Sequence, residues 1–352
     1  MSSVPFLIEE CLLKNRRVMI SSAVSHPNKA FVIYWGNDNH DLNVPTRSSL
    51  SMNLHGISQP LNYYVTMKTN KNLDRDIVLV NNTEDKGEIY SRIIRHLNLM
   101  RRYTGFKEKI QIVTKTTFPI GAGLAGSAAS ASALAQAFVG LFDSGLHKSN
   151  VSLLARLGSG SGARSVYGGF VELQKTDNLQ SYGRQVFDEM YWDLRDIIAV
   201  VDPAAKKINS RDGMMLSKMT CPREIYSNFV FVADLHIKET ISAINSKNIQ
   251  KLGEFYEKEN LLFRKVCLNT RPSLDYWSRI TQHVLLQVTK LRLEGVFAYA
   301  GTDAGPNVHV FTLPTYANKV VETIQEIKGV KSIIHCSPGE GSHLIQEHLP
   351  SK

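Results

Sequence analysis

The chain has 352 residues and a formal net charge of +9 at pH 7, and 43% of its residues are hydrophobic. Its length allows two modest domains or one large one. The basic residues are scattered or stand in short pairs such as Arg101 and Arg102. Because they form no module of interleaved aromatic and basic residues, we expect no nucleic-acid partner. A small polyanionic substrate, together with general adaptation of the surface to the host cytoplasm, accounts better for the positive charge.

No apolar run reaches the roughly 18 residues that a membrane helix needs, so we expect a soluble enzyme with no membrane partner. The N-terminal segment carries Glu9 and Glu10 inside its apolar part and its basic cluster afterwards, which argues against a secretion signal. The four cysteines form no CxxC pair and stand at Cys11, Cys221, Cys267 and Cys336. They predict free thiols in a reducing cytoplasm.

Hydrophobic spacing predicts the elements in chain order. The N-terminal part is predicted to form strands over 18–35, 48–58 and 60–82, the last as a strand pair, and then a helix over 86–104. A strand over 110–115, a glycine-rich turn, helices to about 143 and over 149–157, and strands over 168–174 and 196–202 follow. The C-terminal part is more helical, over 214–220, 222–234, 238–245, 247–266 and 272–291, before strands over 296–300, 307–313 and 332–336.

The glycine-rich turn is the most informative local feature. Gly121, Gly123, Gly126 and Ser127 lead directly into an alanine-rich helix, and a strand precedes them. Glycines let the backbone approach a ligand, and the free N–H groups of a helix start favour phosphate. The run matches neither a Walker loop nor a dinucleotide fingerprint. A tightly packed helix start without a ligand is the alternative.

Three further motifs occur in order along the chain. They are YWG at 34–36 with LNVPT at 42–46, GSGSGARSVYGGF at 158–170, and YAGTDAGPNV at 299–308. Together with the glycine-rich turn, they closely resemble diphosphomevalonate decarboxylases and their relatives in the galactokinase–homoserine kinase–mevalonate kinase (GHMP) superfamily. The resemblance extends from about residue 24 to about residue 311, which is most of the chain.

The resemblance implies an α+β fold with two lobes, over 1–200 and 201–352, and an active site in the cleft between them. The sequence shows no linker, so the boundary near residue 200 comes from the resemblance. It also implies a phosphorylated mevalonate as substrate and, by family analogy, a cytoplasmic homodimer.

Two residues carry the chemistry that the resemblance implies. Asp303 precedes a Gly-Pro turn and would otherwise be an ordinary turn residue, and Arg164 would otherwise be a structural arginine. The resemblance makes Asp303 the catalytic aspartate near the substrate's C3 oxygen and Arg164 the arginine that grips the substrate carboxylate. A planar guanidinium suits that task because it donates two parallel hydrogen bonds. The implied substrate-binding residues are Ser159, Ser161, Ser210, Arg211, Tyr34, Asn28 and Lys29.

The departures from the family pattern concern phosphoryl transfer. The resemblance leads us to expect lysines on both sides of Tyr-Trp-Gly, but Ile33 and Asn37 stand there. It also leads us to expect two adjacent serines in the glycine-rich turn, but Gly126 replaces the first and only Ser127 remains. Phosphoryl transfer depends on cations and metal-holding hydroxyls around the moving phosphate. The turn is therefore predicted to be a remnant phosphate loop, and either Lys29 or Arg47 is available to restore some missing charge.

This pattern fits an archaeal branch of the family that acts without ATP. Its members convert mevalonate 3,5-bisphosphate to isopentenyl phosphate, phosphate and CO2 in a mevalonate pathway to isoprenoids. Asp303 would stabilise the positive charge that develops at C3, and Arg164 would align the carboxylate. We therefore expect neither a cofactor nor a metal.

Three other functions stay open. The first is an ATP-dependent decarboxylase of mevalonate 5-phosphate or 5-diphosphate, which would use Mg-ATP. The second is a catalytically silent binding relative, against which the retained Asp303 and Arg164 argue. A 3-kinase is a minor option that the DAGPN context of Asp303 disfavours.

Overall fold

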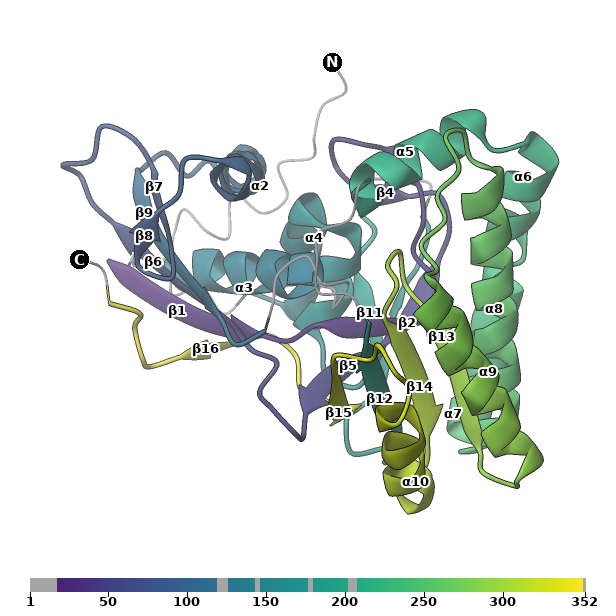
Figure 1. Ribbon diagram of the computed structural model, residues 1–352. Coiled ribbons are helices and arrows are strands. Elements are labelled where there is room, and N and C mark those ends of the chain that lie inside the picture. The colour runs from purple at the N-terminus through teal and green to yellow at the C-terminus, as the bar shows by residue number, and fades with distance from the viewer. Residues whose placement is uncertain (1–17, 119–125, 143–145, 177–179, 202–207, 351–352) are drawn as a thin grey trace.

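The structure is a computed structural model that describes residues 18–118, 126–142, 146–176, 180–201 and 208–350 (Figure 1). Gly121 and Gly123, two residues of the predicted phosphate loop, lie outside these ranges. So does Cys11, whereas Cys221, Cys267 and Cys336 are buried free thiols.

A six-stranded sheet forms one side of the molecule (Figure 1). Its strands are, in order, β16 (His343–Ile345), β1 (Ile20–Ser25), β6 (Tyr63–Thr69), β9 (Ile110–Thr116), β7 (Ile77–Val80) and β8 (Thr83–Glu84). The helices of this half are α2 (Glu88–Thr104), α3 (Gly126–Gly140) and α4 (Lys148–Gly158). The alanine-rich α3 packs directly on β1 and β6. Its small buried side chains let the helix approach the sheet closely.

The second sheet has eight strands among the described residues. Its main path is β11 (Gly183–Phe187), β10 (Phe170–Leu173), β5 (Ser49–Gly56), β15 (Ser332–Pro338), β12 (Arg195–Val200), β14 (Val308–Thr312) and β13 (Ala298–Thr302), and β2 (Asn28–Val32) also pairs with β5. The β5–β15 pairing joins strands from opposite halves of the chain. A short hairpin of β3 (Asn37–Asn39) and β4 (Val44–Pro45) follows β2.

Side chains alternate between the two faces of this sheet, as the period of a strand requires. On one face, Ile197 and Val310 pack in an apolar cluster with α9 (Arg279–Leu293) and α10 (Pro314–Gln325). On the other face, Ile198 and Phe311 join the main core, which includes residues of β2 and α8 (Ile249–Asn269).

The remaining helices are α5 (Ser210–Thr220), α6 (Arg223–Phe231) and α7 (Ala233–Asn245), and a short 3₁₀ helix, η1 (Gly160–Val166), follows α4. Helix α8, at the right of Figure 1, packs against α5, α6, α7, β2 and β13. Within the described ranges, no helix combines the length and apolar character needed to cross a membrane.

The α+β prediction is confirmed, with local differences. The segment predicted to be helical over 272–291 becomes helical only at Arg279, after a capping box formed by Ser278 and Thr281. Helix α10 was not predicted, although Pro314 stands in its first turn and its buried residues have helical spacing. Strands β11 and β16 were also not predicted. The boundary near residue 200 stays a prediction.

Candidate functional site

An ion pair joins the two strands that lead into the site. The Lys29 ammonium on β2 donates to Asp303 Oδ1 over 2.6 Å, and Asp303 directly follows β13. The Lys29 side chain is fully buried, whereas the Asp303 side chain is 26% exposed. The carboxylate is therefore the member of the pair that a ligand can reach.

The Arg164 guanidinium is buried among neutral groups. Its Nε donates to Ser51 Oγ over 2.7 Å, its Nη1 donates to Ser49 Oγ, and its Nη2 donates to Asn28 Oδ1 over 3.2 Å. Burial lowers the pKa of Arg164 to about 10, while Tyr34 and Asp303 act in the opposite direction. The side chain therefore remains a cation at neutral pH, and its hydrogen bonds hold it without cancelling its charge.

The serine-rich segment lies beside Arg164. Asn28 Nδ2 donates to the Ser161 carbonyl over 3.0 Å, and the Ser159 and Ser161 hydroxyls are 3.1 Å apart. A Cβ at position 160 would overlap the Tyr34 ring, which explains the glycine there. The structure thus brings together the predicted residues of β2 and η1.

Tyr34 and Arg211 both contact the β3–β4 hairpin. The Tyr34 hydroxyl, whose pKa is raised by burial, donates to Asn37 Oδ1 and to the Asn43 carbonyl. Arg211, in the first turn of α5, donates to the His40 carbonyl over 2.7 Å. Ser210 begins the same helix, so the hairpin connects the predicted α5 residues to the rest of the candidate site.

The chain matches two sequence models of known domains. The Diphosphomevalonate decarboxylase-like N-terminal domain matches residues 25–183, and the Mevalonate 5-diphosphate decarboxylase C-terminal domain matches residues 196–345. The diphosphomevalonate decarboxylase of Danio rerio is 32% identical over 85% of this chain and 77% of that protein. The Homo sapiens enzyme is 32% identical over 81% of this chain and 75% of that protein. The chain belongs to the diphosphomevalonate decarboxylase family.

Solved structures agree with this membership. Mevalonate diphosphate decarboxylase from Staphylococcus aureus aligns with a TM-score of 0.87 at 28% identity, covering 93% of this chain and 98% of that one. MDDEF in complex with MVAPP, AMPPCP and magnesium aligns with a TM-score of 0.86 at 26% identity, covering 94% and 99%. The family is one of decarboxylases, which are carboxy-lyases.

The structure distinguishes the two cations that the sequence left available. Arg47 is fully buried in an ion pair with Glu259, at 2.6 Å, and its guanidinium lies 3.6 Å from the centre of the Phe229 ring. It also donates to the Ile33 carbonyl over 3.2 Å, while Glu259 Oε1 accepts the Ile33 N–H over 3.1 Å. Arg47 therefore fixes the backbone where the family pattern has a lysine, and Lys29 is the cation that contacts Asp303.

The described residues at the predicted nucleotide site meet only some of the requirements for binding a nucleotide. Ser127 is exposed in the first turn of α3, whose N-terminus suits a phosphate. Ile33 is buried in an apolar cluster, and Asn37 hydrogen-bonds to Tyr34, so neither position offers a cation.

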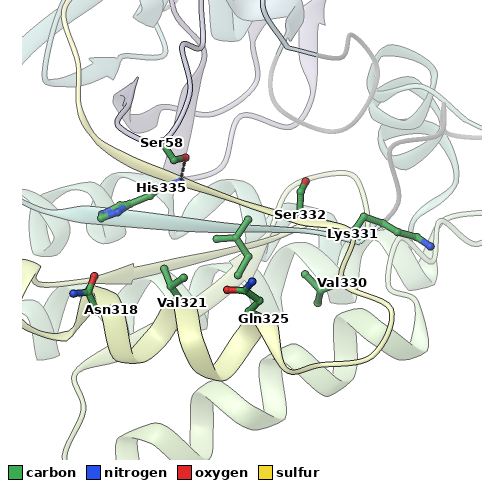
Figure 2. A pocket seen from close by; sticks show the side chains of 9 residues that line it. Ser58, Asn318, Val321, Gln325, Val330, Lys331, Ser332 and His335 are labelled. Atoms are coloured by element: carbon green, nitrogen blue, oxygen red, sulfur yellow. Dashed lines mark hydrogen bonds between the residues drawn. The ribbon is translucent and has the colours of Figure 1, made fainter.

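Two cavities flank the C-terminal half. One of about 380 Å³ lies between α10 and β15 and contains none of the predicted site residues (Figure 2). In it, the His335 N–H donates to Ser58 Oγ over 3.0 Å. A cavity of about 10 Å³ reaches Asp303 and Trp277. The candidate site is therefore identified by its charged groups and hydrogen bonds, and not by cavity size.

Three residues of α8 next to the site were missed by sequence reasoning. They are Tyr256, Glu259 and Asn260, which contact Lys29, Ile33 and Thr302 respectively. Buried polar residues within an otherwise amphipathic helix were the available signal, but the sequence does not show which strand they face.

Proposed function

We propose that this protein decarboxylates a mevalonate that is phosphorylated at O5, with phosphate leaving from C3. The C1–C2 bond breaks to release CO2, its electron pair forms the C2=C3 double bond, and the C3–O bond breaks to release phosphate. The observation that carries the proposal is the partly exposed Asp303 carboxylate, held by buried Lys29 within electrostatic range of the Arg164 cation.

Each charged group has a separate role in this reaction. Arg164 binds the substrate carboxylate, because its neutral partners leave its positive charge available. Asp303 faces C3 and stabilises the positive charge that develops there as phosphate departs. Lys29 orients Asp303 by donating to its carboxylate. Arg211, Tyr34 and the serines of η1 bind the rest of the phosphorylated substrate.

Two sources of the C3 phosphate each have support. The relatives favour transfer from ATP, since the solved MDDEF complex contains MVAPP, AMPPCP and magnesium. Ile33 and Asn37 favour a substrate that arrives already phosphorylated at O3, because phosphoryl transfer needs cations that these side chains do not supply. The homodimer and the cytoplasmic location stay predictions.

One assay tests the proposal and separates its two versions. Purified protein is incubated with mevalonate 3,5-bisphosphate, 5-phosphate or 5-diphosphate, each with and without Mg-ATP, and CO2, phosphate and ADP are measured. CO2 release from the bisphosphate without nucleotide supports the ATP-independent version, whereas ADP release with the 5-diphosphate supports the ATP-dependent one. Arg164→Met serves as the control for contaminating activity. Absence of CO2 in every arm would contradict the proposal.

A further inference from the structure

Lys29 has an unusual environment for an ammonium group. Its side chain is fully buried, and its ion pair is with Asp303. The Nζ atom also lies 5.5 Å from the centre of the Tyr256 ring. Tyr256 belongs to α8 and is only 1% exposed. A buried ammonium needs compensating contacts, and an aromatic ring within about 6 Å supplies one through the negative face of its π system.

The Tyr256 ring is fixed from two sides. It packs edge-on against Phe311, with centroids 4.9 Å apart, and against Phe31, with centroids 6.3 Å apart. Phe31 lies two residues after Lys29 on β2, so one strand carries both the ammonium and part of the packing that orients the ring. The ring therefore cannot turn away from Lys29 without disturbing the core.

The same helix also holds the strand that ends at Asp303. Asn260 Oδ1 accepts the Thr302 N–H over 2.6 Å. A Cβ at Gly253 would overlap the Tyr299 ring, so this glycine lets α8 approach β13. Helix α8 thus contacts both strands that carry the Lys29–Asp303 pair.

We propose that Tyr256 is a positioning residue whose ring face holds the Lys29 ammonium against Asp303. This inference rests on the proposed function for its effect on turnover. A second carboxylate in place of the ring would compete with Asp303 for the ammonium, whereas a ring stabilises the cation without taking its charge. The Asn260 side chain interacts with the Tyr256 hydroxyl, whereas the contact with Lys29 is made by the ring.

The test compares variants that keep or remove the ring. Tyr256→Phe keeps it and is expected to retain kcat within about twofold. Tyr256→Met keeps apolar bulk without a ring and is expected to lower kcat at least about tenfold with little change in KM. Tyr256→Leu serves as a second ring-free variant if the methionine protein does not fold. In Lys29→Met protein, Tyr256→Met is expected to cause no further loss.

Two results would overturn the inference. One is a kcat loss from Tyr256→Met that is equally large with Lys29 and with Met at position 29. The other is a loss from Tyr256→Phe as large as that from Tyr256→Met. When turnover is absent or too slow to measure, a double-mutant cycle followed by urea unfolding tests the contact. It compares the parent, Tyr256→Met, Lys29→Met and the double variant. If the double variant lowers the urea midpoint by less than the sum of the two single variants, the contact is supported even if the proposed function fails. If the decreases add up, the contact is refuted.

Discussion

At Arg164, hydrogen bonds from three nitrogen atoms fix the orientation of the planar guanidinium. Its Nε, Nη1 and Nη2 atoms each donate to a different side chain of β2 or β5. Arg164→Lys keeps the charge but cannot reproduce the planar fork. We expect a loss of about 2–4 kcal/mol of transition-state stabilisation, measured as kcat/KM.

The control for that substitution is Arg101→Lys, which alters another arginine that donates through two nitrogens. Arg101 donates to both oxygens of Asp76, in the layer of the six-stranded sheet, and among the described residues no predicted site residue hydrogen-bonds to it. We expect Arg101→Lys to lower the thermal midpoint and to leave kcat/KM unchanged. If Arg164→Lys kept a near-normal kcat/KM, Arg164 would be a structural arginine and not the group that binds the substrate carboxylate.

Asp303→Asn is expected to abolish most activity and also to destabilise the fold. The sequence alone predicts a stable variant, because asparagine suits a turn. The structure changes that expectation, since the substitution leaves the buried Lys29 ammonium without its carboxylate. We expect a cost of about 1–3 kcal/mol, below the range for fully buried pairs because Asp303 is partly exposed.

A double variant separates the two effects of that substitution. Asp303→Asn combined with Lys29→Met removes both charges, so urea unfolding should return toward the parent stability while turnover stays low. If the double variant regained turnover, Asp303 would not be the group that stabilises C3. If Asp303→Asn alone kept full activity, Asp303 would be a turn residue.

The sequence singled out Asp303 and Arg164 as candidate catalytic residues because both stand in recognisable motifs, and their roles stay predictions. The sequence did not decide whether Lys29 or Arg47 replaces the missing positive charge, because residue spacing does not show which side chain contacts Asp303. Glu259 decides that question by pairing with Arg47 from a position 212 residues away. Because the two residues are far apart in the chain, local residue spacing did not predict this contact.

His96, in the contact between α2 and α4, is expected to make the free energy of unfolding depend on pH. His96 Nε2 donates to the Leu154 carbonyl over 2.8 Å, and the ring leaves no room for a Cβ at Gly158. Burial lowers the pKa of His96 to about 4. Below an ordinary pKa of 6.5 the unfolded chain takes up a proton that the folded chain does not. The free energy of unfolding should therefore fall between pH 6.5 and 4, by up to about 3 kcal/mol.

Urea unfolding across that pH window measures the effect. His96→Gln retains an N–H donor but does not titrate, so its stability should depend less on pH. His55→Gln, which changes an exposed histidine on β5, is the matched control for the substitution itself. An unchanged slope in His96→Gln would show that other groups cause the pH dependence.

Helical spacing predicted α2 well, but it misplaced the start of α9. Residues 272–278 contain apolar side chains that looked like the first turns of a helix. Leu274 is instead buried in the cluster around Trp35, and the Tyr276 ring lies edge-on to the Trp35 ring at 6.3 Å. Tertiary packing thus keeps this segment out of the helix, and the helix begins at Arg279.

Across the whole molecule, the eight-stranded sheet ties the two predicted lobes together. Strand β5 pairs with β15, and β12 lies between β15 and β14. A fragment of residues 1–200 would lose these partners and expose buried β12 side chains such as Ile197, which packs in the cluster formed with α9 and α10. We therefore predict that this fragment does not fold alone and that the full chain unfolds in a single transition.

Far-UV circular dichroism and tryptophan fluorescence during urea unfolding check this prediction. Coincident curves are expected for the full chain, and no cooperative transition is expected for the 1–200 fragment. Co-expression with the 201–352 fragment is the control, because β15 can then pair with β5 and should restore a cooperative transition. If the 1–200 fragment alone unfolded cooperatively with a midpoint near that of the full chain, the β5–β15 pairing would not be needed for folding. The boundary near residue 200 would then separate two independent folding units.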